Sequence, residues 1–193
     1  PFKKKEVRQA LYQAIDIEAI KKKVMRGLSE PAGIITFPGV NGYTEELDKR
    51  LPYDVDAAKK LLADAGYPKG FDVELRCPND RYVNDEAICT AVVGMFGKIG
   101  VNVNLFAQTK SKHFKELKED KGDFYMLGWG VPTLDSHYVF HYLYESGASW
   151  NKVNFSNSDV DAAIRVMEGE VDLDKRNAAI ANAWKIVKDD ISY

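Results

Sequence analysis

Two histidines four residues apart, His137 and His141, have the spacing of a metal-binding pair. Glu145 continues the same spacing, and Asp135 precedes the first histidine. On a helix His137, His141 and Glu145 would share one face, and two imidazoles placed in this way can bind zinc. Aromatic residues crowd the same segment, and the end of a structural helix explains the pattern as well. A zinc hydrolase that uses His137 and His141 is therefore the alternative function, and a segment without metal is the preferred interpretation.

No other segment has a familiar catalytic signature. The sequence lacks Gly-x-Ser-x-Gly, a Gly-rich phosphate loop, His-Glu-x-x-His and Cys-x-x-Cys. The third histidine, His113, stands alone among lysines, which predicts a solvent-exposed surface residue. The sequence therefore offers little support for an enzyme.

Composition narrows the class of protein further. The chain has 193 residues and a net charge of -2, with 45% hydrophobic and 29% charged residues. A chain of this length can bury a core of its own. Without an excess of basic residues, nothing indicates a nucleic-acid partner.

Apolar residues recur at helical spacing in several segments. Asp16 and Asp54 precede two of these segments and can cap the helices, and Gly66 stands where a left-handed residue ends a helix. Residues 29–53, rich in Pro and Gly, form a long connection of a kind that is often functional. The apolar stripes are Val7, Ala10, Leu11, Ala14 and Ile15; Ile17, Ile20 and Val24; Ala58, Leu61, Leu62 and Ala65; Val160, Ala163, Ile164 and Met167; and Ile180, Ala183, Trp184 and Val187.

The middle of the chain alternates between strand and helix patterns. Strands are predicted from Phe71, from Val101 and over residues 123–127, with a helix ended by Gly100 and a second helix capped by Ser111 between them. Strand–helix–strand–helix–strand implies two right-handed crossovers and three parallel strands. The predicted fold class is α/β, with a parallel βαβαβ core flanked by helices.

Polar and aromatic residues follow each predicted strand. Ligands of parallel sheets collect at the carboxyl ends of the strands, so these residues form the candidate ligand site. Trp129 lies there between Gly128 and Gly130, which let a backbone or a ligand approach, while the indole supplies a flat apolar wall. The alternative is that Trp129 simply fills the core. The site candidates are Asn79, Asp80, Arg81, Tyr82, Gln108, Trp129, Gly130, Pro132, Thr133, Asp135 and His137.

Four segments carry a family resemblance: VRQALYQAIDIEAI (Val7 to Ile20), YDVDAAKKLLADAGYPKGFDVEL (Tyr53 to Leu75), GDFYMLGWG (Gly122 to Gly130) and NFSNSDVDAAI (Asn154 to Ile164). In order and spacing they resemble the extracytoplasmic solute-binding proteins of family 5, the dipeptide- and oligopeptide-binding components of ABC importers. The resemblance spans nearly the whole chain. It implies that residues 1–193 form a single domain with a mixed sheet, the excised C-terminal lobe of a two-lobed clamp. The start at Pro1 and the end at Tyr193 fit this expectation.

The resemblance also implies the function. Such proteins are not enzymes and need no cofactor or resident metal; they close two lobes around a peptide or similar small solute and deliver it to a membrane permease. The implied partners are the solute, the ABC transporter permease and the missing first lobe of the same protein. The implied location is periplasmic or extracytoplasmic, with the full-length protein free or lipid-anchored.

Carried over residue by residue, the Trp of the family's Gly-Trp motif, which lines the ligand cleft of relatives, matches Trp129. Peptide binders have an Asp three residues later, which pairs with the amino terminus of the ligand. Here that position is Pro132, which carries no charge. Asp80 and Asp135 are the available substitutes; alternatively, the ligand has no free amine.

The two cysteines, Cys77 and Cys89, lie at the end of the first predicted strand and in the early turns of the next helix. That placement can bring their Cα atoms within the roughly 4.4–6.8 Å that a disulfide needs. If the resemblance holds, the compartment is oxidising and the bridge persists. We expect a bridge that pins the Asn79–Tyr82 loop; two buried free thiols are the alternative.

Overall fold

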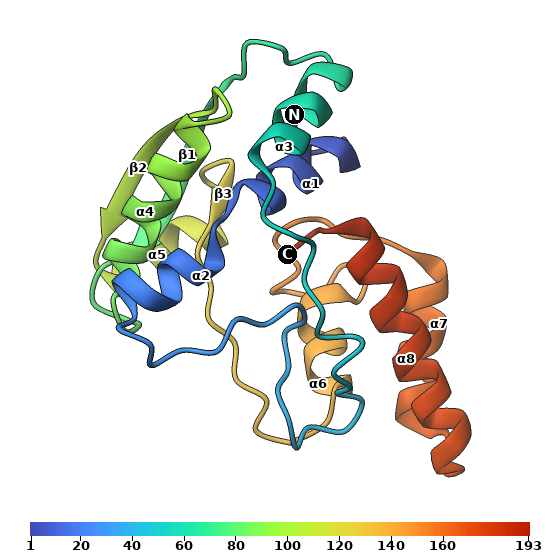
Figure 1. The fold of residues 1–193 in the computed structure, drawn as a ribbon. Helices are drawn as coiled ribbons and strands as arrows, with labels where there is room; N and C mark the ends of the chain where they lie inside the picture. The colour runs from blue at the N-terminus through green and yellow to red at the C-terminus, as the bar shows by residue number, and fades with distance from the viewer. The chain divides into compact units, whose positions relative to one another are not determined.

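The computed structural model describes all residues from 1 to 193, and their contacts divide the chain into two compact units. Unit 1 comprises residues 1–31 and 51–128, and unit 2 comprises residues 32–50 and 129–193. The elements of unit 1 are α1 (Lys5–Ala14), α2 (Ile17–Ala19), the π-helix η1 (Ile20–Val24), α3 (Val55–Asp64), β1 (Asp72–Pro78), α4 (Asp85–Gly97), β2 (Asn102–Gln108), α5 (Lys110–Lys118) and β3 (Phe124–Tyr125) (Figure 1). Those of unit 2 are α6 (His137–Val139), the π-helix η2 (Phe140–Tyr144), α7 (Ser158–Gly169) and α8 (Leu173–Asp190).

The sheet of unit 1 has the predicted parallel topology. Its strand order is β2-β1-β3, and β1 pairs in parallel with both neighbours. All three strands are parallel, so the sheet consists of the parallel core alone and is not mixed. The third strand is also shorter than the predicted residues 123–127, since only Phe124 and Tyr125 are paired.

The two crossover helices cover opposite faces of this sheet. Cys77 on β1 is bridged to Cys89 on α4, whereas its neighbour Arg76 pairs with Glu116 on α5. Because successive side chains of a strand point to opposite faces, α4 and α5 must lie on different sides. The α4 side carries the apolar core of the unit, to which α1 and α3 contribute Val7, Ala10, Leu11, Ala14, Ala58, Leu62 and Ala65.

Local sequence explains where the helices begin. The carboxylates of Asp16 and Asp54 accept backbone N–H groups of α2 and α3, as predicted. Gly66 follows α3 with φ +93°, a conformation that glycine adopts without strain. The start of α5 differs from the prediction, because the helix begins at Lys110 after Thr109 rather than at Ser111.

Unit 2 is built on the pair α7 and α8 (Figure 1). The predicted apolar stripes of both helices are buried. Trp184 packs on Phe140 with ring centroids 4.5 Å apart, and both side chains are fully buried. Residues 32–50, the larger part of the predicted long connection, belong to this core. Val40 and Leu47 are buried there, so the segment has a structural role in unit 2.

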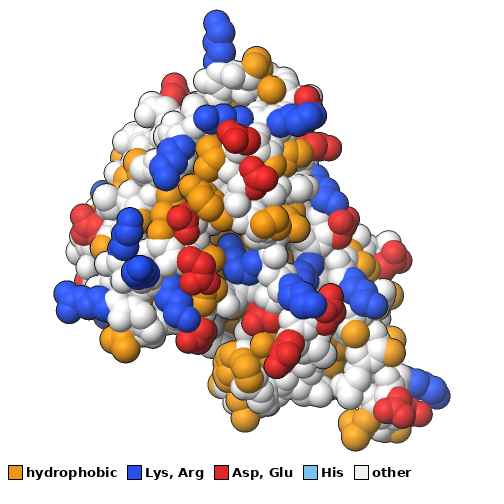
Figure 2. All heavy atoms as spheres, viewed as in Figure 1, with side chains coloured by type: hydrophobic (Ala, Val, Ile, Leu, Met, Phe, Trp, Pro, Cys, Tyr) orange, Lys and Arg blue, Asp and Glu red, His pale blue; other side chains and the backbone are white.

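Charged side chains of both signs are interspersed over the face shown in Figure 2. This mixture agrees with the small net charge of -2. Among the helices, none combines the length and the apolar character required to cross a bilayer. The expectation that residues 1–193 form one domain of a longer protein stays a prediction.

Candidate functional site

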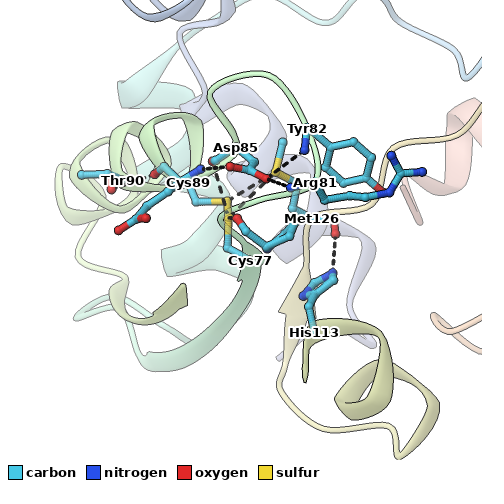
Figure 3. Close-up of a disulfide and its surroundings, with 10 residues drawn as sticks. Cys77, Arg81, Tyr82, Asp85, Cys89, Thr90, His113 and Met126 are labelled. Atoms are coloured by element: carbon cyan, nitrogen blue, oxygen red, sulfur yellow. Dashed lines mark hydrogen bonds between the residues drawn. A yellow bond between two sulfur atoms is a disulfide. The ribbon is translucent and has the colours of Figure 1, made fainter. Parts of the chain in front are cut away.

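The loop after β1 is organised by one buried carboxylate. Asp85, at the start of α4, accepts the backbone N–H groups of Arg81 and Tyr82 at 2.9 Å each, and that of Glu86 at 2.9 Å (Figure 3). Burial would raise the pKa of Asp85, but these backbone hydrogen bonds outweigh it, and the pKa lies below its usual value. Asp85 therefore holds the Arg81–Tyr82 turn in a fixed conformation.

Sequence reasoning did not select Asp85. Its signal was a carboxylate in the first turn of a helix directly after a polar loop, a position where Asp commonly accepts backbone N–H groups. The side chains that it positions are more open: Arg81 is exposed and Tyr82 is half-buried. Asp85 is thus a positioning residue, and Arg81 and Tyr82 are available for contact with a ligand.

The disulfide between Cys77 and Cys89 is confirmed. The bridge joins β1 to α4 across a separation of 12 residues, with the two Cα atoms 6.6 Å apart. The Met126 sulfur lies 3.9 Å from the Cys77 sulfur and 3.6 Å from the Cys89 sulfur (Figure 3). The bridge and Asp85 together tie both ends of the 79–84 loop to the core.

The other candidates near the strand ends are held by neighbouring elements. Asp80 accepts the backbone N–H of Lys110 at 2.5 Å and so caps the first turn of α5. The backbone N–H of Asn79 donates to the Gln108 carbonyl at 2.9 Å. The buried Gln108 amide donates to Glu116 at 2.8 Å. Gln108 therefore links β2 to α5. Asn79 and Asp80 are exposed.

His113 contradicts its predicted surface location. The side chain is fully buried, and its Nε2 lies 3.0 Å from the Met126 carbonyl. Burial lowers the pKa of His113 because the charged imidazolium would lose its hydration. The prediction failed because the lysines beside it in sequence lie on the other face of α5, and this face was decided by packing on the sheet.

Trp129 lies in a group of aromatic side chains in unit 2. Its ring centroid is 6.1 Å from Tyr138, 5.9 Å from Tyr142 and 5.9 Å from Trp150. The indole is half-buried, and its Nε1 donor has no acceptor. Buried donors are normally satisfied, so this N–H is a group that a ligand or a water could satisfy.

The two glycines around Trp129 have different reasons to be glycine. A Cβ at Gly128 would lie 2.6 Å from Cε1 of the Tyr82 ring, whereas a Cβ at Gly130 would meet no atom within 4 Å. The Tyr82 hydroxyl also points at the Gly128 carbonyl, at 3.4 Å. Gly128 is therefore required for the close approach of Tyr82, and Gly130 is not required on steric grounds.

Replacing Gly128 with alanine is expected to displace the Tyr82 ring and to destabilise the protein by about 1 kcal/mol, the low end of the cost of overpacking, because Tyr82 is only half-buried. Gly130→Ala is the matched control, and no steric penalty is expected there. Urea unfolding followed by far-ultraviolet circular dichroism measures both. Equal losses in the two variants would contradict the contact with Tyr82 as the cause.

Asp135 is engaged by its own unit. The Arg176 guanidinium donates to both carboxylate oxygens, at 2.8 and 2.9 Å. The Asn41 amide donates at 3.0 Å and the His137 backbone N–H at 2.9 Å. Burial would raise the pKa of Asp135, but the bonds from Arg176, His137 and Asn41 lower it below its usual value. A carboxylate with four donors has little capacity left to anchor a ligand amine.

The remaining site candidates lie in the stretch of unit 2 that also holds Trp129 and Asp135. Pro132 and Thr133 are exposed, as is Gly130, and His137 is half-buried. His137 and His141 stack with ring centroids 5.6 Å apart, close to Glu168 from α7. The structure thus groups Trp129 with aromatic residues, Asp135 with Arg176, and the histidines with a glutamate that their sequence spacing did not indicate.

Known proteins similar to this chain identify its family. The sequence model of the bacterial extracellular solute-binding proteins, family 5 Middle, matches residues 1–151. The heme-binding protein A of Haemophilus influenzae is 30% identical over 97% of this chain and 35% of its own length. The dipeptide-binding protein of Escherichia coli is 30% identical over 81% of this chain and 30% of its own length.

A solved structure agrees in fold. The periplasmic binding protein DppA of Helicobacter pylori, in complex with the peptide STSA, superposes with a TM-score of 0.90 at 22% identity, over 100% of this chain and 38% of that one. The chain therefore spans about a third of the length of these relatives. With the family model matched over residues 1–151, the chain belongs to the bacterial extracellular solute-binding proteins of family 5.

Proposed function

We propose that this chain is part of the solute-binding protein of an ABC importer, which captures peptides outside the cytoplasm and delivers them to a membrane permease. Family membership over residues 1–151 carries this proposal, and the dipeptide-binding relative supports peptide as the ligand. The role is binding without chemistry, so the protein is not an enzyme. The remainder of the clamp would come from the rest of a longer protein.

Trp129 is the residue we propose as the main ligand contact in unit 2. Large aromatic side chains dominate binding energy because they bury much apolar surface at little entropic cost. Its unsatisfied Nε1 donor could pair with a peptide carbonyl. Gly130, Pro132, Thr133 and His137 are proposed as neighbouring contacts, with Asp135 fixing the backbone of His137.

In unit 1 we propose Asn79, Asp80, Arg81 and Tyr82 as a second set of contacts, with Gln108 supporting them. The exposed Arg81 could pair with a peptide carboxylate, since a guanidinium binds carboxylates bidentately. With Pro132 at the position of the usual amine anchor, and Asp135 occupied by Arg176, Asp80 remains the candidate partner for a ligand amine.

The test is calorimetric titration of di- to pentapeptides into the whole protein that carries this chain. Trp129→Ala is expected to weaken peptide binding about 30-fold, equivalent to about 2 kcal/mol for a central aromatic contact. Trp129→Phe should lose less, because it keeps a flat aromatic ring although it removes the donor and part of the indole surface. Phe37→Ala is the control, since Phe37 is an exposed aromatic side chain of the same unit outside the Trp129 group.

Unchanged peptide affinity in Trp129→Ala would remove Trp129 from the site. The class of ligand is tested separately, because the heme-binding protein A is as similar to this chain, at 30% identity, as the dipeptide-binding protein is. Haem is titrated in parallel, and tight haem binding without any peptide binding would overturn peptide as the ligand.

A further inference from the structure

We propose that His137, His141 and Glu168 bind a divalent transition-metal ion, for which Zn²⁺ is the probe. All three residues belong to unit 2. Their ligand atoms lie within 4.8 Å of one another. The site has a binding role only, and it goes beyond the proposed peptide function, with which it shares His137.

Two of the three distances between the ligand atoms are near those of a filled site, and all three lie within 4.8 Å. His137 Nε2 lies 3.5 Å from Glu168 Oε1, and His141 Nδ1 lies 4.0 Å from the same oxygen. In tetrahedral zinc sites with bonds near 2.1 Å, two ligand atoms are about 3.4 Å apart. Glu168 is 45% exposed, so its side chain can close its own distances to the imidazoles at little cost. The two imidazole nitrogens, within 4.8 Å of each other, would also have to move closer together.

The two imidazole nitrogens also lack hydrogen bonds. Both His137 Nε2 and His141 Nδ1 are shielded from solvent and have no hydrogen-bond partner. Glu145 Oε2 lies 2.9 Å from His141 Nδ1, but this contact does not have hydrogen-bond geometry. Buried polar atoms without partners are uncommon in native proteins, and a bound cation would satisfy both nitrogens at once.

Neighbouring residues fix the backbone that carries the proposed metal ligands. The backbone N–H of His137 is fixed by Asp135, which is itself held by Arg176 on α8. The segments α6 and η2 both pack against α7, which carries Glu168. A metal would therefore fasten the α6–η2 segment, with the Trp129 neighbours Tyr138 and Tyr142, to α7.

The ligand set selects the metal. Two imidazoles and one carboxylate suit Zn²⁺, Ni²⁺ or Cu²⁺, whereas Mg²⁺ prefers oxygen ligands alone. The i, i+4 histidine spacing was visible in the sequence, but Glu168 is 27 residues beyond His141 by residue number. Only the packing of α7 against this segment brings the third ligand into place.

The experiment is calorimetric titration of ZnCl₂, with MgCl₂ in parallel, into the whole protein that carries this chain, without a polyhistidine tag. One Zn²⁺ per chain is expected, with no Mg²⁺ binding. His137→Ala, His141→Ala and Glu168→Gln should each weaken Zn²⁺ binding at least about tenfold. Glu46→Gln removes the same charge from an exposed residue of unit 2 outside the cluster and should leave Zn²⁺ binding unchanged.

Circular dichroism checks that each variant is folded, and Glu168→Gln is the least disruptive because the Glu168 side chain is the most exposed of the three. Nuclear magnetic resonance of the imidazole protons gives a second readout: Zn²⁺ should shift the signals of His137 and His141 and not that of His113. Absence of Zn²⁺ binding, or binding that survives Glu168→Gln unchanged, would overturn the site. Equal Mg²⁺ binding would show a general acidic surface and would overturn it too.

Discussion

Replacing Cys77 and Cys89 together with alanine is expected to lower the free energy of unfolding of unit 1 by about 3 kcal/mol. The bridge joins residues 12 apart, and closing a loop of that length restricts the unfolded chain by about this amount. The two side chains are 0% and 3% exposed, so the folded unit also loses sulfur atoms that pack against Met126. An effect of this size is a large part of the stability of a small unit.

The measurement can separate the two units because all three tryptophans, Trp129, Trp150 and Trp184, belong to unit 2. Far-ultraviolet circular dichroism follows both units, whereas tryptophan fluorescence follows unit 2. Loss of the bridge should shift the circular-dichroism transition in urea much more than the fluorescence transition. Dithiothreitol should have the same effect on the natural protein and none on the double variant.

Two results would contradict this expectation. One is a natural protein whose unfolding is insensitive to reductant. The other is two free thiols per chain in the unfolded, unreduced protein. Reduction of the bridge is expected to change the 79–84 loop less. Asp85 should keep Arg81 and Tyr82 in place, because its hydrogen bonds to their backbone do not involve the bridge.

Asp135→Asn is expected to destabilise unit 2 by about 2–3 kcal/mol at pH 7. The carboxylate receives two bonds from Arg176, one from Asn41 and one from the His137 backbone. An amide cannot accept all four, and the Arg176 guanidinium then keeps an uncompensated charge. The side chains of Arg176 and Asp135 are 17% and 22% exposed, so the expected loss is below that of a fully buried pair.

This contribution should depend on pH in a defined direction. The pKa of Asp135 is lower in the folded protein than its usual value of about 3.9. Its stabilisation is therefore complete above about pH 4 and is lost as the pH falls through the lower folded pKa. The difference between the natural protein and Asp135→Asn should be constant near neutral pH and should shrink in more acidic solution.

Urea titrations followed by tryptophan fluorescence measure this effect, since unit 2 holds every tryptophan. A double-mutant cycle with Arg176→Met isolates the pair, and a coupling of at least about 1 kcal/mol is expected. Glu46→Gln is the control: it breaks an exposed pair with Lys49 and should cause no measurable change. A loss in Asp135→Asn no larger than in this control would mean that Asp135 does not organise the segment.

Much of unit 1 could be predicted from sequence because its determinants are local. The apolar stripes of α1 and α3 and the alternation along β1 and β2 follow from the repeats of helix and strand, and the parallel order follows from the crossover rule. The disulfide belongs with these features, because Cys77 and Cys89 are close in sequence and lie on adjacent elements. The segments that resemble family 5 likewise predicted the family whose model matches residues 1–151.

The partners of the polar side chains could not be predicted in the same way. His113 looked exposed because lysines surround it in sequence, yet the packing of α5 on the sheet buries it. Asp135 looked free to bind a ligand, yet Arg176, 41 residues away, and Asn41, 94 residues away, occupy it. Glu168 stands beside the histidines only because α7 packs there.

The sequence by itself thus predicted most helices, the parallel strands and the bridge from patterns within short stretches of chain, and the family from four segments in their order. Tertiary structure alone decided that residues 32–50 join residues 129–193 in one unit, and which charges and imidazoles meet. The physical reason is the separation along the chain over which each effect acts. Periodicity acts between neighbours in the chain, whereas a carboxylate or an imidazole is satisfied by whichever group the packing of distant elements brings within about 3 Å.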